Sequence, residues 1–90
     1  MPDICKKFIV EGRVQGVGFR YHTCHEGLKL NTTGYAKNQS DGTVEVMVCG
    51  QPIDVDALER WLMIGPRTAH VESVVREPCE YQLYRGFKIL

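Results

Sequence analysis

The alternation of apolar and polar residues predicts most of the strands in this chain. The pattern is clear at residues 43–49, where three alternate valines would face a core and the other alternating set, Glu45, Met47 and Cys49, would lie on the open face. Residues 5–14 alternate in the same way, and a period of two is typical of a sheet covered on one side only. The full set of expected strands is residues 5–14, 34–38, 43–49, 70–77 and 86–89.

Two further stretches are expected to be helices. Residues 54–64 carry an apolar stripe at helical spacing, with Asp54 as the N-cap and Gly65-Pro66 as the stop. Residues 19–30 are assigned to a helix mainly by exclusion. Their interior glycine, Gly27, should cost roughly 1 kcal/mol relative to alanine, and we expect close packing on the sheet to compensate. The resulting order β-α-β-β-α-β is typical of a ferredoxin-like α+β sandwich, in which two helices cover one face of an antiparallel sheet of four to five strands.

The stretch GRVQGVGFR, residues 12–20, joins the first strand to the first helix and contains three glycines. Glycine allows positive φ angles and a close approach to a ligand, and the N–H groups of such a turn can hold an anion together with the helix dipole. Arg20 adds a planar charged group that suits phosphate or carboxylate. The stretch is not a nucleotide P-loop, because GxxxxGK[ST] is absent, and Tyr21 stands where a dinucleotide fingerprint needs a small residue. From these residues alone, a tight turn with a surface arginine is an equally good interpretation.

A family resemblance decides between the two. GRVQGVGFR, followed by GYAKN at residues 34–38 and DGTVEV at residues 41–46, closely resembles the acylphosphatase family. The likeness continues through residues 65–66, 69–71 and 87–89, so it spans nearly the whole chain in family order.

The resemblance implies the spatial strand order 4-1-3-2. Strands one and two would then be parallel, and their C-terminal ends would lie at the same edge of the sheet. The glycine-rich loop and Asn38, which ends the second strand, would meet there. The link formed by residues 65–69 should emerge at that edge too.

The resemblance also implies an activity, the hydrolysis of acyl phosphates to a carboxylate and inorganic phosphate without a cofactor. In that reading Arg20 binds the phosphate and Asn38 orients the attacking water. The phosphate-binding loop would be formed by the backbone of Gln15, Gly16, Val17, Gly18 and Phe19. The leaving carboxylate needs no proton, since carboxylic acids have pKa values of roughly 4, and phosphoryl transfer depends mainly on positioning and charge stabilisation.

Composition narrows the classes of partner. The 90 residues suffice for a single domain, 1–90, and the 11 basic residues balance the 11 acidic ones. A neutral chain argues against a nucleic-acid or anionic-membrane surface, and no apolar helix face requires a partner, so we expect a monomer that acts on a small molecule. Residues 1–7 lack the apolar region of a signal peptide, which predicts a cytoplasmic protein. Neither the histidines nor the cysteines (Cys5, Cys24, Cys49 and Cys79) show the spacing of a metal site.

Two of the cysteines suggest a possible disulfide. If strands one and three pair with Phe8 opposite Val46, Cys5 lies directly opposite Cys49. A bridge is then geometrically conceivable, although two free thiols are at least as consistent with a reducing cytosol.

Several residues near the expected site have simpler interpretations. His22 and His25 are expected to be surface residues of the helix, and Trp61 to be part of the core. Arg67 could enlarge the positive field of the site or be an exposed bystander.

Two alternatives to the enzyme remain. One is a non-catalytic phosphate- or acyl-phosphate-binding module of the same fold. The other is an RNA-binding module, against which the neutral charge and the lack of an exposed aromatic pair argue.

Overall fold

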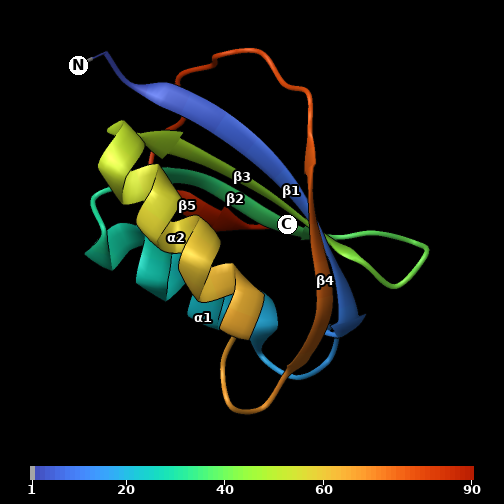
Figure 1. Ribbon diagram of the computed structural model, residues 1–90. Helices are drawn as coiled ribbons and strands as arrows, with labels where there is room; N and C mark the ends of the chain where they lie inside the picture. Colours follow the sequence, from blue (N-terminus) through green and yellow to red (C-terminus); the bar gives the residue numbers. More distant parts are fainter. Residues whose placement is uncertain (1) are drawn as a thin grey trace.

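The computed structural model describes residues 2–90 and contains the expected β-α-β-β-α-β order followed by a short fifth strand (Figure 1). No bound differs from its predicted position by more than two residues. The elements are β1 (Ile4–Arg13), α1 (Phe19–Lys29), β2 (Thr33–Asn38), β3 (Val44–Gly50), α2 (Pro52–Ile64), β4 (His70–Glu77) and β5 (Phe87–Ile89). Within this part of the chain, no helix is long and apolar enough to cross a membrane.

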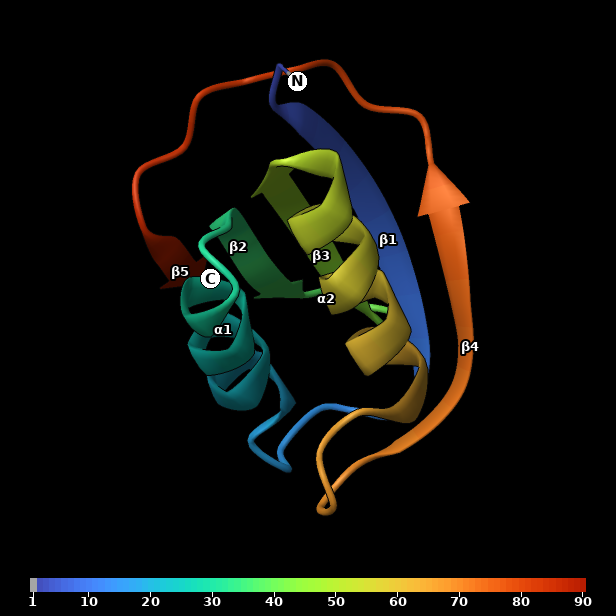
Figure 2. The ribbon, with the colours of Figure 1, turned by 60° about the vertical axis from the view of Figure 1, so that its left-hand side comes forward.

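The five strands form one sheet in the order β4-β1-β3-β2-β5, and both helices cover the same face of it (Figure 2). The ferredoxin-like fold and the order of the first four strands are thereby confirmed. The expectation of a wholly antiparallel sheet is wrong at one edge, because β5 pairs parallel to β2. Between β4 and β5 the chain crosses the outer face of the sheet, and it enters β5 from the same end at which β2 begins.

The core lies between the helices and the inner face of the sheet. The three alternate valines of β3 are fully buried there, as the alternation predicts. They pack in one cluster with side chains from β1 and from both helices, among them Phe8, Val10, Phe19, Val55, Leu58 and Leu62.

The interior glycine of α1 permits the close packing that the sequence requires. A methyl group on Gly27 would overlap the ring of Phe87 in β5. The helix therefore lies closer to the edge of the sheet than any larger residue would allow, which confirms the expected compensation.

The start of α2 differs from the prediction. Asp54 is not the N-cap: Gln51 occupies that position without a side-chain hydrogen bond, and Pro52 is the first helical residue. Proline suits this position because its fixed φ is already helical and its missing N–H would have no partner inside the helix. Asp54 lies within the first turn, where its charge still favours the helix dipole. Gly65 ends the helix with φ 73°, as expected.

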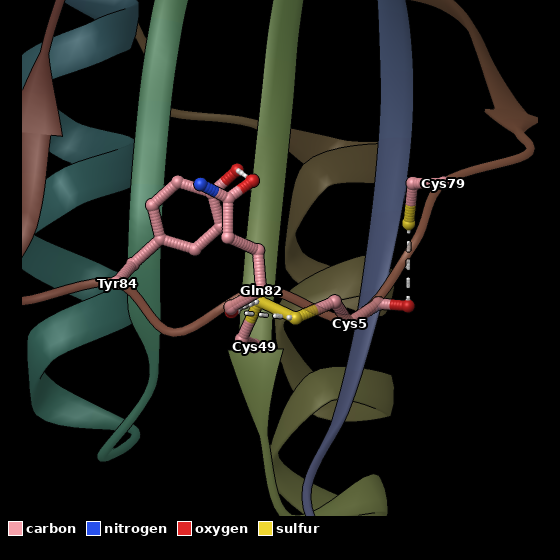
Figure 3. The surroundings of a disulfide bond; sticks show 5 residues. All are labelled: Cys5, Cys49, Cys79, Gln82 and Tyr84. Carbon is pink, nitrogen blue, oxygen red and sulfur yellow. Dashed lines mark hydrogen bonds between the residues drawn. A yellow bond between two sulfur atoms is a disulfide. The ribbon is translucent and has the colours of Figure 1, made fainter.

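The outer face of the sheet is not open where the sequence predicted it to be. Met47 and Cys49 are each only 5% exposed. Residues 78–86 cross this face (Figure 3), and the main-chain oxygen of Gln82 lies 3.3 Å from Cys5 Sγ and 3.6 Å from Cys49 Sγ. An alternating strand shows which residues share a face, but it cannot show whether an irregular segment covers that face.

Beneath this segment the structure joins Cys5 and Cys49 by a disulfide (Figure 3). The expected register holds, with Phe8 opposite Val46 and Cys5 opposite Cys49, and the two Cα atoms are 4.0 Å apart. Cys24 and Cys79 are free thiols.

Candidate active site

The loop between β1 and α1 turns at two of its glycines. Gly16 and Gly18 adopt left-handed φ angles of 73° and 80°, which glycine adopts without strain. Gly18 is also the N-cap of α1, and no side chain caps the helix there or places an acidic group in its first turn. The first N–H groups of the helix are therefore without side-chain acceptors, and the positive end of its dipole is not neutralised by a local carboxylate.

Arg20 and Asn38 lie at the same edge of the sheet. Arg20, in the first turn of α1, donates a hydrogen bond from Nη1 to the main-chain oxygen of Leu90 at 2.8 Å. The backbone N–H of Asn38, at the end of β2, reaches the same oxygen at 3.4 Å. Beside Arg20 a cavity of about 170 Å³ is lined by Gly16, Gly18 and other residues of this edge. The topology thus brings together two residues that are far apart in the sequence, as the parallel directions of β1 and β2 predict.

The side chain of Asn38 has an unused hydrogen-bond acceptor. Its Oδ1 atom is buried and has no partner among residues 2–90. A buried polar atom left unpaired costs about 1–3 kcal/mol, so the protein would be stabilised if the Asn38 side chain turned to meet a bound water or ligand donor.

The side chain of Gln15 connects the glycine-rich loop with the β2–β3 turn. Its Nε2 donates to the main-chain oxygens of Gln39 at 2.8 Å and Thr43 at 2.9 Å. Sequence reasoning used only the backbone of Gln15 and missed this contact. A long amide between glycines, next to a strand end expected to adjoin Asn38, is the signal that could have indicated it.

The link between α2 and β4 reaches the same edge. Thr68 donates a hydrogen bond from Oγ1 to the main-chain oxygen of Val17 at 2.6 Å. Arg13 in turn donates to the main-chain oxygen of Thr68 at 3.5 Å. Two other loops, the β2–β3 turn and the link between α2 and β4, therefore support the glycine-rich turn, and the placement expected for residues 65–69 is confirmed.

The free thiol of Cys24, on the buried face of α1, is not a nucleophile for this site. Burial raises its pKa to about 11, although a backbone hydrogen bond and the charge of Arg20 oppose the rise. The thiol lies 3.3 Å from the main-chain oxygen of Lys88, to which it donates. At neutral pH it is protonated. Among residues 2–90, no group of three or more His, Cys, Asp or Glu side chains is placed to hold a metal ion.

Comparison with known proteins identifies the family. The acylphosphatase family model matches residues 6–89, a range that includes the glycine-rich loop, Arg20 and Asn38. The chain belongs to the acylphosphatase family. The resemblance seen in the sequence motifs is thereby confirmed.

Relatives and solved structures agree over the full length of the domain. A protein named Acylphosphatase from Vibrio parahaemolyticus is 63% identical over 96% of this chain and 96% of its own length. Another of that name from Vibrio cholerae is 58% identical over the whole of both chains. The structure of an acylphosphatase from Coxiella burnetii matches with a TM-score of 0.92 at 35% identity, over 98% of this chain and 93% of that one.

Proposed function

We propose that this acylphosphatase-family chain hydrolyses acyl phosphates to a carboxylate and inorganic phosphate, with the phosphate bound by residues 15–20 and the attacking water oriented by Asn38. The observation that carries the residue assignment is the buried, unpartnered Oδ1 of Asn38, which lies at the same edge as the uncapped start of α1 and Arg20. An oriented acceptor, a set of N–H donors and a fixed cation are the three groups that this reaction requires.

The phosphate would be held by the backbone N–H groups of the loop and by Arg20. A guanidinium has five N–H donors, and only one nitrogen of Arg20 is engaged, with Leu90. The remaining donors can contact two phosphate oxygens in parallel. In the transition state the charge on the equatorial oxygens would be balanced by Arg20 and the helix N-terminus, so the proposed reaction uses no metal ion.

The water would approach the phosphorus on the side opposite the acyl oxygen. Asn38 Oδ1 accepts one hydrogen bond from it and so fixes its direction. A carboxamide is too weak a base to take the proton, so the proton passes to a phosphate oxygen of the substrate. A new P–O bond forms from the water as the bond between phosphorus and the acyl oxygen breaks, and the carboxylate leaves without protonation.

The decisive experiment measures phosphate release from benzoyl phosphate in the presence of EDTA. Arg20→Ala should lower kcat/KM by about 10²–10³-fold or more, because it removes a preorganised charged donor. Asn38→Ala should lower kcat by a similar factor of about 10² with little change in KM, because it acts on the water and not on the bound phosphate.

Arg85→Ala provides the matched control, since Arg85 is an exposed arginine on the segment that crosses the outer face. Circular dichroism of each variant checks the fold. If the folded wild type binds phosphate but does not release it from any acyl phosphate, the non-catalytic binding module is the correct interpretation.

A further inference from the structure

A second hollow adjoins the glycine-rich loop, on the side where α1 meets the end of α2 and the link to β4. It has a volume of about 380 Å³, and its walls include His22, His25, Trp61, Pro66, Arg67 and Thr68. None of these side chains is assigned to contact the phosphate or the attacking water, although Thr68 supports the loop from outside.

Two contacts show how directly this hollow borders the loop. Thr68 is hydrogen-bonded to the main-chain oxygen of Val17. The imidazole of His22 lies so near Gly18 that a methyl group there would be 3.6 Å from its Cδ2. A substrate whose phosphate occupies the loop therefore has this hollow as one neighbouring space for its acyl group.

The walls of the hollow combine a flat apolar surface with positive charge. Trp61 is half-buried and packs near Phe19, with ring centroids 6.3 Å apart, which holds the indole in place. Arg67 is exposed and makes no ion pair or side-chain hydrogen bond within residues 2–90. The one carboxylate of the hollow, Glu26, lies 3.6 Å from the Nζ of Lys29 and is thereby partly neutralised.

We propose that this hollow binds the acyl group of the substrate, and that Arg67 favours acyl phosphates whose acyl group carries a second carboxylate. The inference rests on the proposed function. A planar acyl group would pack against Trp61 and Pro66, and its distal carboxylate would pair with the free guanidinium of Arg67. Arginine suits this role because its planar fork matches both oxygens of a carboxylate.

The test compares benzoyl phosphate with 4-carboxybenzoyl phosphate, which differ only in a carboxylate on the ring. The measured quantity is kcat/KM for 4-carboxybenzoyl phosphate divided by kcat/KM for benzoyl phosphate. Comparing this ratio between the wild type and each variant cancels the difference in intrinsic reactivity of the two substrates. Arg67→Ala should lower this ratio about threefold to fivefold, the effect expected of an exposed charge pair. Arg67→Lys should retain part of the preference, and Arg85→Ala all of it.

Ionic strength offers an independent check, because salt screens an exposed pair. The wild-type ratio should fall towards that of Arg67→Ala as salt rises to about 1 M, where the Debye length is about 3 Å. A ratio that is the same in the wild type and in Arg67→Ala would overturn the proposal.

Binding of the product dicarboxylate separates this inference from the proposed function. The chain has a single tryptophan, so titration with terephthalate can be followed by Trp61 fluorescence, with benzoate as the matched ligand. If neither acyl phosphate is hydrolysed, the proposed function fails, and tighter binding of terephthalate by the wild type than by Arg67→Ala still supports the hollow. Equal binding by the two proteins would overturn it.

Discussion

The side chain of Gln15 holds together two parts of the proposed site that are distant in the sequence. Arg20 lies on the helix that follows the glycine-rich loop, whereas Asn38 precedes the β2–β3 turn. Gln15 contributes two hydrogen bonds between this loop and that turn. We therefore expect it to act as a positioning residue.

Gln15→Ala tests this role. Each net hydrogen bond contributes about 0.5–1.5 kcal/mol, so the free energy of unfolding should fall by roughly 1–2 kcal/mol, as measured by urea denaturation. Because the turn next to Asn38 is loosened, kcat should fall about tenfold with KM nearly unchanged.

Gln82→Ala is the control for this prediction, because the Gln82 side chain lies on the outer face, away from the site, and accepts a hydrogen bond from Tyr84 at 3.3 Å. If Gln15→Ala loses stability but keeps the wild-type kcat, Gln15 stabilises the fold and does not position the site.

Among the secondary-structure elements, the pairing of β1 with β3 has the clearest chemical consequence. The antiparallel register places Cys5 opposite Cys49, and residues 78–86 cover the pair (Figure 3). Cys79 belongs to this covering segment and donates from Sγ to the main-chain oxygen of Cys5 at 3.5 Å. The cysteines of the outer face are therefore gathered in one place, whereas Cys24 lies on the helix side of the sheet.

This arrangement predicts the order in which the cysteines react with iodoacetamide at pH 8, without reductant, in protein purified in air. Only Cys79 should be labelled in the folded protein. The Cys24 thiol is buried and its pKa is about 11, so it stays protonated and unreactive. Unfolding without reductant should add Cys24, and reduction should add Cys5 and Cys49, as located by peptide mass spectrometry.

Labelling of Cys5 or Cys49 before reduction would contradict the disulfide.

Reduction of the disulfide should lower the free energy of unfolding. The cysteines are 44 residues apart, and the chain-entropy relation gives about 4 kcal/mol for a loop of this size.

For the whole molecule, basic and acidic residues are equal in number, but the arginines are not evenly distributed over the surface. The net charge is zero, yet three arginines lie near one edge of the sheet: Arg13 at the end of β1, Arg20 in the first turn of α1 and Arg67 in the link between α2 and β4. Local positive charge can attract a small anion over a distance of about a Debye length, roughly 8–10 Å. It does not amount to the extended basic surface that nucleic-acid binding requires.

We accordingly expect a monomer without affinity for RNA. The most exposed large apolar residues are spread over the molecule, with Ile53 and Ile64 at opposite ends of α2 and Leu83 on the covering segment. Sedimentation equilibrium should give the mass of one chain, and filter binding at two salt concentrations should detect no RNA complex. A dimer mass, or RNA retained at the higher salt, would contradict this expectation.

The single domain and the cytoplasmic location also stay predictions. The single domain is supported by the one sheet and one core cluster in residues 2–90.

The sequence by itself determined the elements, the inner face of the sheet and the family, because each can be recognised from the order of residues along the chain. Alternating valines specify which face of β3 meets the core, glycines specify where the backbone turns, and each family motif, at residues 12–20 and 34–38, is a continuous stretch of the chain. The register of Cys5 with Cys49 followed from the sequence only under the assumption that Phe8 lies opposite Val46, and the structure has this register.

Only the tertiary structure decided the features that depend on contacts between distant segments. It showed that residues 78–86 cover the outer face, that β5 joins β2 in parallel, that Gln15 bonds the β2–β3 turn and that Arg67 borders a hollow beside the loop. The segment of residues 78–86 has no periodic pattern from which its contacts could be predicted. Which distant residues a side chain contacts also does not follow from its own position in the sequence. These contacts depend on how the whole chain packs, which a local pattern of apolar and polar residues does not specify.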